Sequence, residues 1–252
     1  TRFREKRPDL DGVEPADGIM NFQKAAQNGL TSTICFPTGN LAPQGSVVKS
    51  TAIDSTVVDT DGIYRMTGPA RIFYSEKEAM RAVKGLTKNS IQAGDVIVLC
   101  GRGPMGSGME EVAQITLALK HLSWGKQVAL LTDARFSGVS TGACIGHIGP
   151  EALAGGPIGK LREGDIIEIK INRRKLIGTI NFIGQAGKII TPNEGKAVLD
   201  QRSAPSELQA DPRLPEDTRL WAALQNVGGG TWGGCVYDTD QIIDILEKNS
   251  VR

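Results

Sequence analysis

The chain has 252 residues, a length that suits one elaborate domain or two small ones and that assures a substantial buried core. Its 29 basic and 28 acidic side chains leave a formal net charge of +1. This balance provides no long-range field that would recruit nucleic acid or an anionic membrane surface, so we expect neither partner.

Targeting signals are not evident in the sequence. No apolar run approaches the roughly 20 residues that cross a bilayer, and the opening TRFREKRPDL lacks the apolar segment of a secretory signal. We therefore expect a soluble, cytoplasmic protein. Because the chain begins without methionine, on a charged and unpatterned stretch, we also expect a trimmed chain or the second half of a larger protein.

The cysteines are scattered, with no C-x-x-C pair and no histidine at ligand spacing; they are Cys35, Cys100, Cys144 and Cys235. This distribution supports neither a zinc site nor a local cluster motif. We expect buried free thiols, because cysteine is among the most frequently buried residues. Convergence of these thiols in space around a metal is the alternative.

Composition divides the chain into three regions. We expect an irregular entry segment over residues 1–45, an α/β domain over 46–190, and a helical extension over 191–252 that packs on the same domain. The entry segment contains the turn-rich loop GNLAPQG (39–45). In the extension, predicted helices at 216–227 and 239–249 flank GGGTWGGC, and they serve as packing elements or as an interface with another chain segment.

The middle region begins with a strand and a helix. ARIFY (70–74) is a short apolar strand, and Ser75 with Glu78 has the spacing of a capping box. A helix that continues to about Leu86 then has an apolar face made of Ala79, Ala82, Val83 and Leu86.

A second strand and helix follow in the same order. We expect buried strands at 93–100 and 127–132, joined by a helix over 109–122, which is a βαβ crossover typical of parallel sheets. Further on, alternating apolar residues in DIIEIKI (165–171) and KLIGTI (175–180) predict a hairpin. The fold class is therefore α/β, with parallel and antiparallel strands mixed.

The glycine-rich stretch GRGPMGSGMEE (101–111) lies between a predicted strand and a predicted helix. Glycines let a backbone approach a bound group closely, and a helix N-terminus favours anions. The spacing matches neither the dinucleotide fingerprint nor the phosphate loop, which disfavours a nucleotide. Two interpretations stay open: a tight turn with acids that complement the helix dipole, or Glu110 and Glu111 directed at a hard cation.

The stretch TDARFSG (132–138) follows the next predicted strand. Because sites gather beyond the carboxyl ends of parallel strands, we expect the Glu111 and Ser137 loops to share one pocket. A serine acts as a base or nucleophile only with help from a neighbouring base or a metal. No G-x-S-x-G elbow surrounds Ser137, which disfavours a hydrolase.

Four further polar residues have candidate roles. We expect His121 at a solvated helix end, where a cation suits the dipole. His147 is either a core or turn residue or a neighbour of Ser137 that orients it or relays a proton. We expect Asp133 and Arg135 to form a structural ion pair that holds the serine loop.

Five ordered motifs resemble the C-terminal half of the dihydroxy-acid and sugar-acid dehydratases, an iron–sulfur family. They are GNLAPQGSVVK (39–49), GDVIVL (94–99), GPMGSGMEE (103–111), TDARFSG (132–138) and GHIGPEALAGGPIGKLREGDIIEI (146–169). The resemblance covers residues 39–184, and the tail with GGGTWGGC is most similar to the xylonate dehydratase branch.

This resemblance implies a swivelling, β-barrel-like α/β domain with flanking helices, which closes over an N-terminal domain of the same polypeptide. That partner domain would carry the iron–sulfur cluster ligands and most Mg²⁺ ligands, so this chain would be inactive alone. Glu111 would be the Mg²⁺ ligand from this half, and Ser137 the alkoxide base that takes the proton from C2. Substrate contacts are expected from Asn40, Ser140, Thr141 and His147.

The implied reaction dehydrates a sugar acid, an aldonate such as D-xylonate, to a 2-keto-3-deoxy acid, in a homodimer or homotetramer. The alternatives are a dihydroxy-acid dehydratase of branched-chain amino-acid biosynthesis and a non-catalytic binding domain of the same fold. The sequence departs from the family pattern at residues 104–107 and 139–141, and Ala134 replaces a usual glycine. None of these departures affects Glu111 or Ser137.

Overall fold

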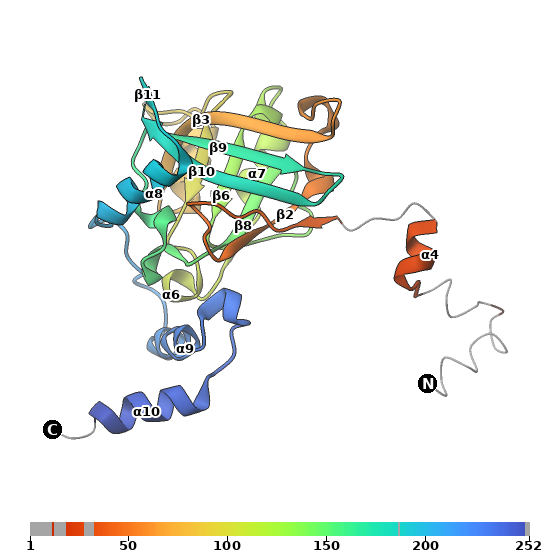
Figure 1. The fold of residues 1–252 in the computed structure, drawn as a ribbon. Coiled ribbons are helices and arrows are strands. Elements are labelled where there is room, and N and C mark those ends of the chain that lie inside the picture. Colours follow the sequence, from red (N-terminus) through yellow and green to blue (C-terminus); the bar gives the residue numbers. More distant parts are fainter. Residues whose placement is uncertain (1–11, 13–18, 28–32, 186, 250–252) are drawn as a thin grey trace. The chain divides into compact units, whose positions relative to one another are not determined.

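The computed structural model of the chain describes residues 12, 19–27, 33–185 and 187–249. The chain divides into two compact units, residues 1–33 and 34–252. Helix α4 (Phe22–Gln27) belongs to the first unit, and every other element below belongs to the second (Figure 1). Much of the irregular segment predicted for residues 1–45 lies outside the described residues, and the predicted boundaries at 45 and 190 stay predictions.

A mixed sheet forms the body of the second unit (Figure 1). Its strand order is β1-β2-β8-β6-β4-β3-β9-β10-β11. The central strands β3, β4, β6 and β8 are parallel neighbours, and the pairs outside them are antiparallel. The bounds are β1 Ile34–Cys35, β2 Gly45–Lys49, β3 Ile63–Phe73, β4 Val96–Leu99, β6 Ala129–Thr132, β8 Ala143–Gly149, β9 Asp165–Asn172, β10 Ile177–Gln185 and β11 Lys188–Ile189. The predicted α/β class with mixed strands is confirmed.

The sheet curls, so that the segment between β1 and β2, near one edge, forms hydrogen bonds with β10, near the opposite edge. Between β1 and β2, the Thr38 amide donates to Gly178 O at 3.1 Å, and the Ile180 amide donates to Thr38 O at 2.8 Å. A Cβ on Gly39 would lie 2.2 Å from Ile180 O, so this close approach requires glycine. The result is the barrel-like curl that the resemblance implied.

The central strands separate two hydrophobic cores. Alternate side chains of β4 point to opposite faces, so Val96 and Val98 join one buried cluster while Ile97 and Leu99 join the other. The first cluster contains the inward isoleucines of β9, and the second contains apolar residues of two covering helices, α5 (Glu76–Val83) and α7 (Gln114–Lys120). Both faces of the central strands are thus buried, as the continuous apolar runs predicted.

Two predicted helices have different bounds in the structure. Helix α5 ends at Val83, because Gly85 adopts a positive φ of 72°, and Leu86 is 63% exposed. The Ser75 side chain makes no capping hydrogen bond, so the predicted capping box is wrong. At the predicted helix 109–122, Met109 also has a positive φ, which interrupts helical geometry.

The region before α7 instead contains a short helix and a short strand. These are α6 (Pro104–Ser107) and β5 (Glu111–Val112), and α7 begins only at Gln114. Glu111 therefore lies in extended backbone, and the prediction that places it in a first helical turn is wrong. His121 is exposed at the C-terminal end of α7, as predicted.

The tail forms three helices, α8 (Pro192–Gln201), α9 (Glu216–Val227) and α10 (Thr239–Asn249). The last two match the predicted helices, and α8, which begins with a capping box at Thr191, was not predicted. Between α9 and α10, the Trp232 indole N–H donates to His147 O at 2.8 Å. Among the described helices, none has both the length and the apolar character needed to span a bilayer.

Candidate functional site

Two segments far apart in the chain form a small parallel ladder beside the main sheet. Strand β5 pairs with β7 (Arg135–Phe136), so that Glu111 lies level with Arg135 and Val112 with Phe136. Val112 is fully buried and Phe136 packs against the same core, which anchors both strands. The ladder brings the segment that carries Glu111 beside the segment that leads into Ser137.

Glu111 has an exposed carboxylate with one charged neighbour. Its side chain is 43% exposed, and Arg135 Nη1 lies 3.6 Å from Glu111 Oε2. Arg135 also donates from Nε to Met109 O at 3.0 Å. The adjacent Glu110 points elsewhere and forms a bidentate pair with Arg102, with both N···O distances 2.6 Å. Of the two acids, Glu111 thus has the more accessible carboxylate, because exposed ion pairs are weak and solvent-screened.

The predicted ion pair between Asp133 and Arg135 does not form. Asp133 is buried and accepts hydrogen bonds from the amides of Gly101, Arg102 and Ala152 at 2.9–3.0 Å, whereas Arg135 extends to Glu111. Burial raises the Asp133 pKa, which its amide donors oppose. The physical reason is that the chain bends at residues 133–134, between β6 and β7, so Asp133 stays buried against the amides while Arg135 is exposed at the start of β7.

Ser137 follows β7 directly and is half-buried. The Val139 amide lies 3.4 Å from Ser137 Oγ as a hydrogen-bond donor, and the Ser140 amide donates to Ser137 O at 2.9 Å. Within the described part of the chain, no side-chain base is hydrogen-bonded to the Ser137 hydroxyl.

His147 lies against β7, close to the serine segment. Its ring meets Phe136 edge to face with centroids 6.1 Å apart, and its backbone has a positive φ of 52°. Burial lowers the His147 pKa, and the charge of Arg135 lowers it further. The imidazole is thus neutral at neutral pH, able to accept or donate one hydrogen bond.

The other predicted substrate contacts have different surroundings. Ser140 is buried, and within the described contacts its hydroxyl has no partner. Thr141 Oγ1 lies 3.5 Å from Thr116 O as a long hydrogen-bond donor. Asn40 is engaged with the backbone far along the chain: its Nδ2 donates to Phe182 O and Pro192 O, and its Oδ1 accepts from the Phe182 amide.

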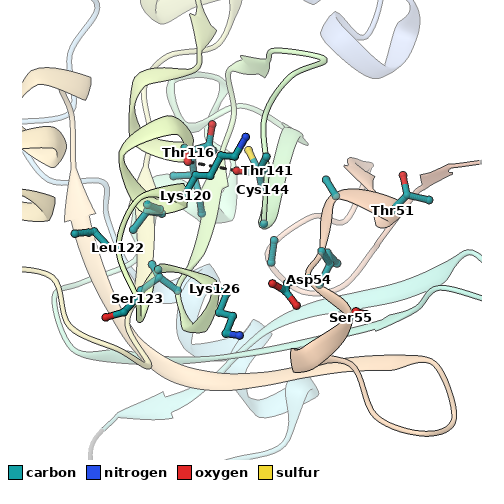
Figure 2. A pocket seen from close by; sticks show the side chains of 18 of the residues that line it. Thr51, Asp54, Ser55, Thr116, Lys120, Leu122, Ser123, Lys126, Thr141 and Cys144 are labelled. Atoms are coloured by element: carbon teal, nitrogen blue, oxygen red, sulfur yellow. Dashed lines mark hydrogen bonds between the residues drawn. The ribbon is translucent and has the colours of Figure 1, made fainter.

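A cavity of about 620 Å³ lies between α7 and the loop that follows β2 (Figure 2). Thr141 lines it, but Glu111 and Ser137 do not. Lys120 and Lys126 also line it, and Figure 2 shows Lys120 near Thr141 but Lys126 near Asp54. Because these cations do not converge, we do not assign this cavity to the candidate site.

The cysteines do not fit an iron–sulfur cluster within this chain. All four are free thiols, and burial raises the pKa of Cys35 to about 11 and of Cys144 to about 12. A cluster needs thiolates, which burial disfavours. Within the described residues, no group of three or more His, Cys, Asp or Glu side chains is placed to hold a metal ion. The exposed carboxylate of Glu111 is the kind of oxygen ligand that Mg²⁺ prefers.

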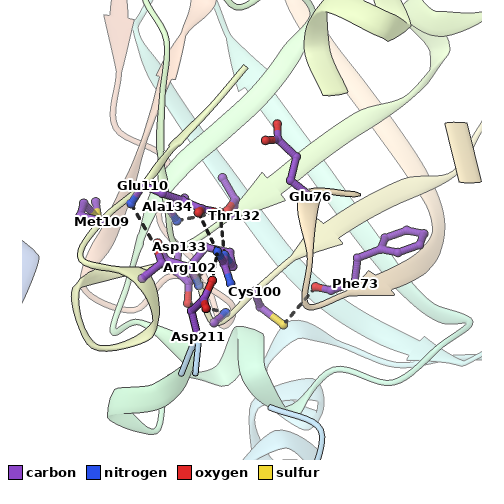
Figure 3. Close-up of polar contacts among 12 residues, drawn as sticks. Phe73, Glu76, Cys100, Arg102, Met109, Glu110, Thr132, Asp133, Ala134 and Asp211 are labelled. Carbon is purple, nitrogen blue, oxygen red and sulfur yellow. Dashed lines mark hydrogen bonds and ion pairs between the residues drawn. The ribbon is translucent and has the colours of Figure 1, made fainter. Parts of the chain in front are cut away.

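Of two buried carboxylates near the site, Asp133 was expected in a structural role but with another partner, and Glu151 was missed in the sequence. Figure 3 shows Asp133 among polar contacts with Arg102 and its neighbours. Glu151 is also buried, and both of its carboxylate oxygens accept from the Met105 amide at 3.1 Å. The position of Asp133 directly after a buried strand indicated a candidate site residue. No sequence pattern marked Glu151, which follows a Gly-Pro turn.

Comparisons with known proteins identify the family of the chain. The family described as "Dihydroxy-acid/6-phosphogluconate dehydratase C-terminal" matches residues 19–198. The chain is 59% identical to D-xylonate dehydratase YagF of Escherichia coli (strain K12) and 54% identical to D-xylonate dehydratase YjhG of the same strain, matching 97% and 98% of this chain. A dihydroxy-acid dehydratase of Methanococcoides burtonii is 50% identical over 55% of this chain and 24% of its own length. This chain spans 37% of YagF and 38% of YjhG. The chain therefore belongs to the dihydroxy-acid/6-phosphogluconate dehydratase family and corresponds to its C-terminal domain.

Proposed function

We propose that this chain is the C-terminal domain of a sugar-acid dehydratase, a hydro-lyase that converts an aldonate such as D-xylonate to a 2-keto-3-deoxy acid. The observation that carries the proposal is the β5–β7 ladder, which sets Glu111 level with Arg135, two residues before Ser137. An acid suited to a metal and a serine suited to proton removal thus lie on adjoining segments. The two Escherichia coli relatives named D-xylonate dehydratases, which match nearly the whole chain, support the aldonate as substrate.

In the proposed reaction, Ser137 acts as an alkoxide and takes the proton from C2 of the aldonate. The electron pair of that C–H bond forms the C2=C3 double bond as hydroxide leaves C3, and the enol tautomerises to the 2-keto-3-deoxy acid. The Val139 amide beside Ser137 Oγ favours the anionic form, because a donor stabilises negative charge. We propose that the neutral imidazole of His147 contacts the substrate, with Ser140 and Thr141 as further contacts.

Glu111 would supply this half's ligand to Mg²⁺, and the cluster ligands would come from an N-terminal domain of the same polypeptide. When bound, Mg²⁺ and the iron–sulfur cluster supply Lewis-acid polarisation of the substrate's oxygens. We leave Asn40 out of the proposed site, since its amide is engaged with backbone groups of β10 and α8. The proposal includes a cytoplasmic homodimer or homotetramer, which light scattering of the purified enzyme would check.

The test is to assay the full-length enzyme, reconstituted with its cluster, on D-xylonate, other aldonates and 2,3-dihydroxyisovalerate. Formation of a 2-keto-3-deoxy acid from an aldonate supports the proposal. Preference for the branched dihydroxy acid would assign the protein to the dihydroxy-acid dehydratases instead. Binding of an aldonate without turnover, in an enzyme with an intact cluster and Mg²⁺, would identify a binding domain.

A further inference from the structure

We infer that Asp133 and Glu151 are positioning residues, which hold the loop from Gly101 to Met109 and thereby fix where Glu111 lies relative to Ser137. The inference rests on the proposed function for the role of Glu111. Both carboxylates are buried, so neither is proposed to touch substrate. Their effect is exerted through the backbone that leads into β5.

Asp133 joins three parts of the chain at one carboxylate. It follows β6, and its oxygens accept from the amides of Gly101 and Arg102, just after β4, and of Ala152, beyond β8. Asp133 is 1% exposed, so these amides have no access to water as an alternative partner. The start of the Glu111 loop is thus attached to the segment that carries Ser137.

Glu151 holds the middle of the same loop. Its carboxylate accepts from the Met105 amide in the first turn of α6, and the backbone of the loop closes around it. A Cβ on Gly103 would lie 2.3 Å from Glu151 Oε2, and a Cβ on Gly106 would lie 2.0 Å from Gly101 O. Glycine at position 103 therefore permits close contact between the loop and the carboxylate, and glycine at position 106 lets the loop fold back on its own start.

Further contacts fix the far end of the loop. Arg102 forms the bidentate pair with Glu110, and Ser107 Oγ donates to Arg102 O at 2.8 Å. Arg135 donates to Met109 O, which links the last loop residue to β7. From Gly101 to Glu110 the loop is held at its start, middle and end, and Glu111 follows directly. A displacement of the loop's start, at Gly101 and Arg102, should therefore move Glu111.

A carboxylate suits this position better than its amide. Asp133 accepts from three backbone amides, whereas asparagine offers one acceptor oxygen and turns an NH₂ group toward another donor. Asp133→Asn thus leaves at least one buried amide unpaired. Asp165→Asn is the matched control, because Asp165 is equally buried, accepts from the Arg162 amide and pairs with Arg202, and lies at the start of β9.

The first experiment measures amide hydrogen exchange in the 252-residue chain itself. We expect Asp133→Asn to raise exchange across residues 101–111 by about tenfold or more, since the loss of one buried hydrogen bond shifts local opening by that order. Asp165→Asn should leave exchange in this loop at the parent's level while altering the start of β9. Equal exchange of residues 101–111 in Asp133→Asn and the parent would overturn the inference, whatever the enzyme's activity.

The second experiment titrates Mg²⁺ against the full-length enzyme. We expect Asp133→Asn and Glu151→Gln to raise the Mg²⁺ concentration for half-maximal activity by about 10- to 100-fold, the usual effect of removing a group that supports a metal ligand. Asp165→Asn should titrate like the parent, and Glu151→Asp should recover part of the loss. An unchanged Mg²⁺ requirement in Asp133→Asn, despite a loosened loop, would overturn the link to Glu111. An inactive parent enzyme would refute the proposed function and leave the exchange result standing.

Discussion

Glu111 lies level with Arg135 in a parallel ladder, and Arg135 Nη1 approaches Glu111 Oε2 at 3.6 Å. The same guanidinium donates to Met109 O, so Arg135 orients the segment that carries the acid as well as the acid itself. Both side chains are about half exposed, and a pair of this kind contributes little to stability. The pair therefore leaves the carboxylate available to a competing cation.

For Glu111→Gln we expect the Mg²⁺ requirement of the full-length enzyme to rise by about tenfold or more, because the neutral amide is a poor ligand for a hard cation. The measurement is a Mg²⁺ titration of initial rates at saturating substrate. Glu78→Gln, which changes an exposed glutamate of α5, is the control. A titration curve that coincides with the parent's would contradict the assigned role.

For Ser137→Ala we expect turnover to fall by about 10²- to 10⁴-fold, the usual contribution of a group that transfers a proton. The visible spectrum of the cluster and the Mg²⁺ requirement should stay unchanged, since the substitution removes only the hydroxyl of one half-buried side chain. Ser123→Ala, on the wall of the cavity in Figure 2, serves as the matched control. Activity of Ser137→Ala within tenfold of the parent would refute its role as the base.

Glu151 should make stability depend on pH. Burial raises the Glu151 pKa from 4.5 to about 7, and the charge of the adjacent Asp133 acts in the same direction. Because the folded state binds this proton more tightly than the unfolded state, the stabilisation is complete below about pH 4.5 and is lost as pH rises through about 7. The loss is on the order of 3 kcal/mol over that interval.

The check is to compare urea unfolding of the parent and Glu151→Gln at several pH values. Glutamine cannot titrate, so the free energy of unfolding of the variant should fall less than that of the parent between these pH values. Asp133 is present in both proteins and its contribution largely cancels. Parallel stability curves for the two proteins would show that Glu151 is not the titrating group.

Trp232 attaches the tail to the sheet. Its ring lies over Gly45 and Gly149, where an added Cβ would lie 2.9 Å and 2.2 Å from it, and its N–H donates to His147 O. We expect Trp232→Phe to lower the free energy of unfolding by about 1 kcal/mol through the lost hydrogen bond, and Trp232→Ala by about 2 kcal/mol or more through lost packing. Urea unfolding measures both, with Trp221→Phe on α9 as the control. Unchanged stability in Trp232→Ala would mean that the tail is held elsewhere.

Local pattern was enough to predict the strands whose apolar character is continuous. All residues of β4 and β6 are buried, and β9, which pairs with β10 in the predicted hairpin, follows the alternation seen in the sequence. The helices α9 and α10 also follow from periodicity alone. In these elements local preference and tertiary packing agree, so the sequence pattern suffices.

The remaining elements depend on contacts that no local pattern records. Strand β8 was missed because of its glycines, yet a Cβ on Gly146 would lie 2.5 Å from Phe136, so glycine is what lets β8 approach β7. The Glu111 and Ser137 loops were expected to share one pocket; the ladder sets the Glu111 segment beside the segment that leads into Ser137, and the shared pocket stays a prediction. The inward position of Asp133 could not be predicted, because it depends on amides 31 and 32 residues earlier in the chain.

The hydrogen bonds between Thr38 and β10 have a consequence for fragment design. They cover backbone groups of Gly178 and Ile180 that would otherwise face solvent along an open strand. A truncated protein that starts at Ser46, the boundary predicted from composition, would lack this cover and present a bare edge. Such edges recruit strands from other molecules, so that fragment should self-associate, whereas one that starts at Ile34 should stay dispersed.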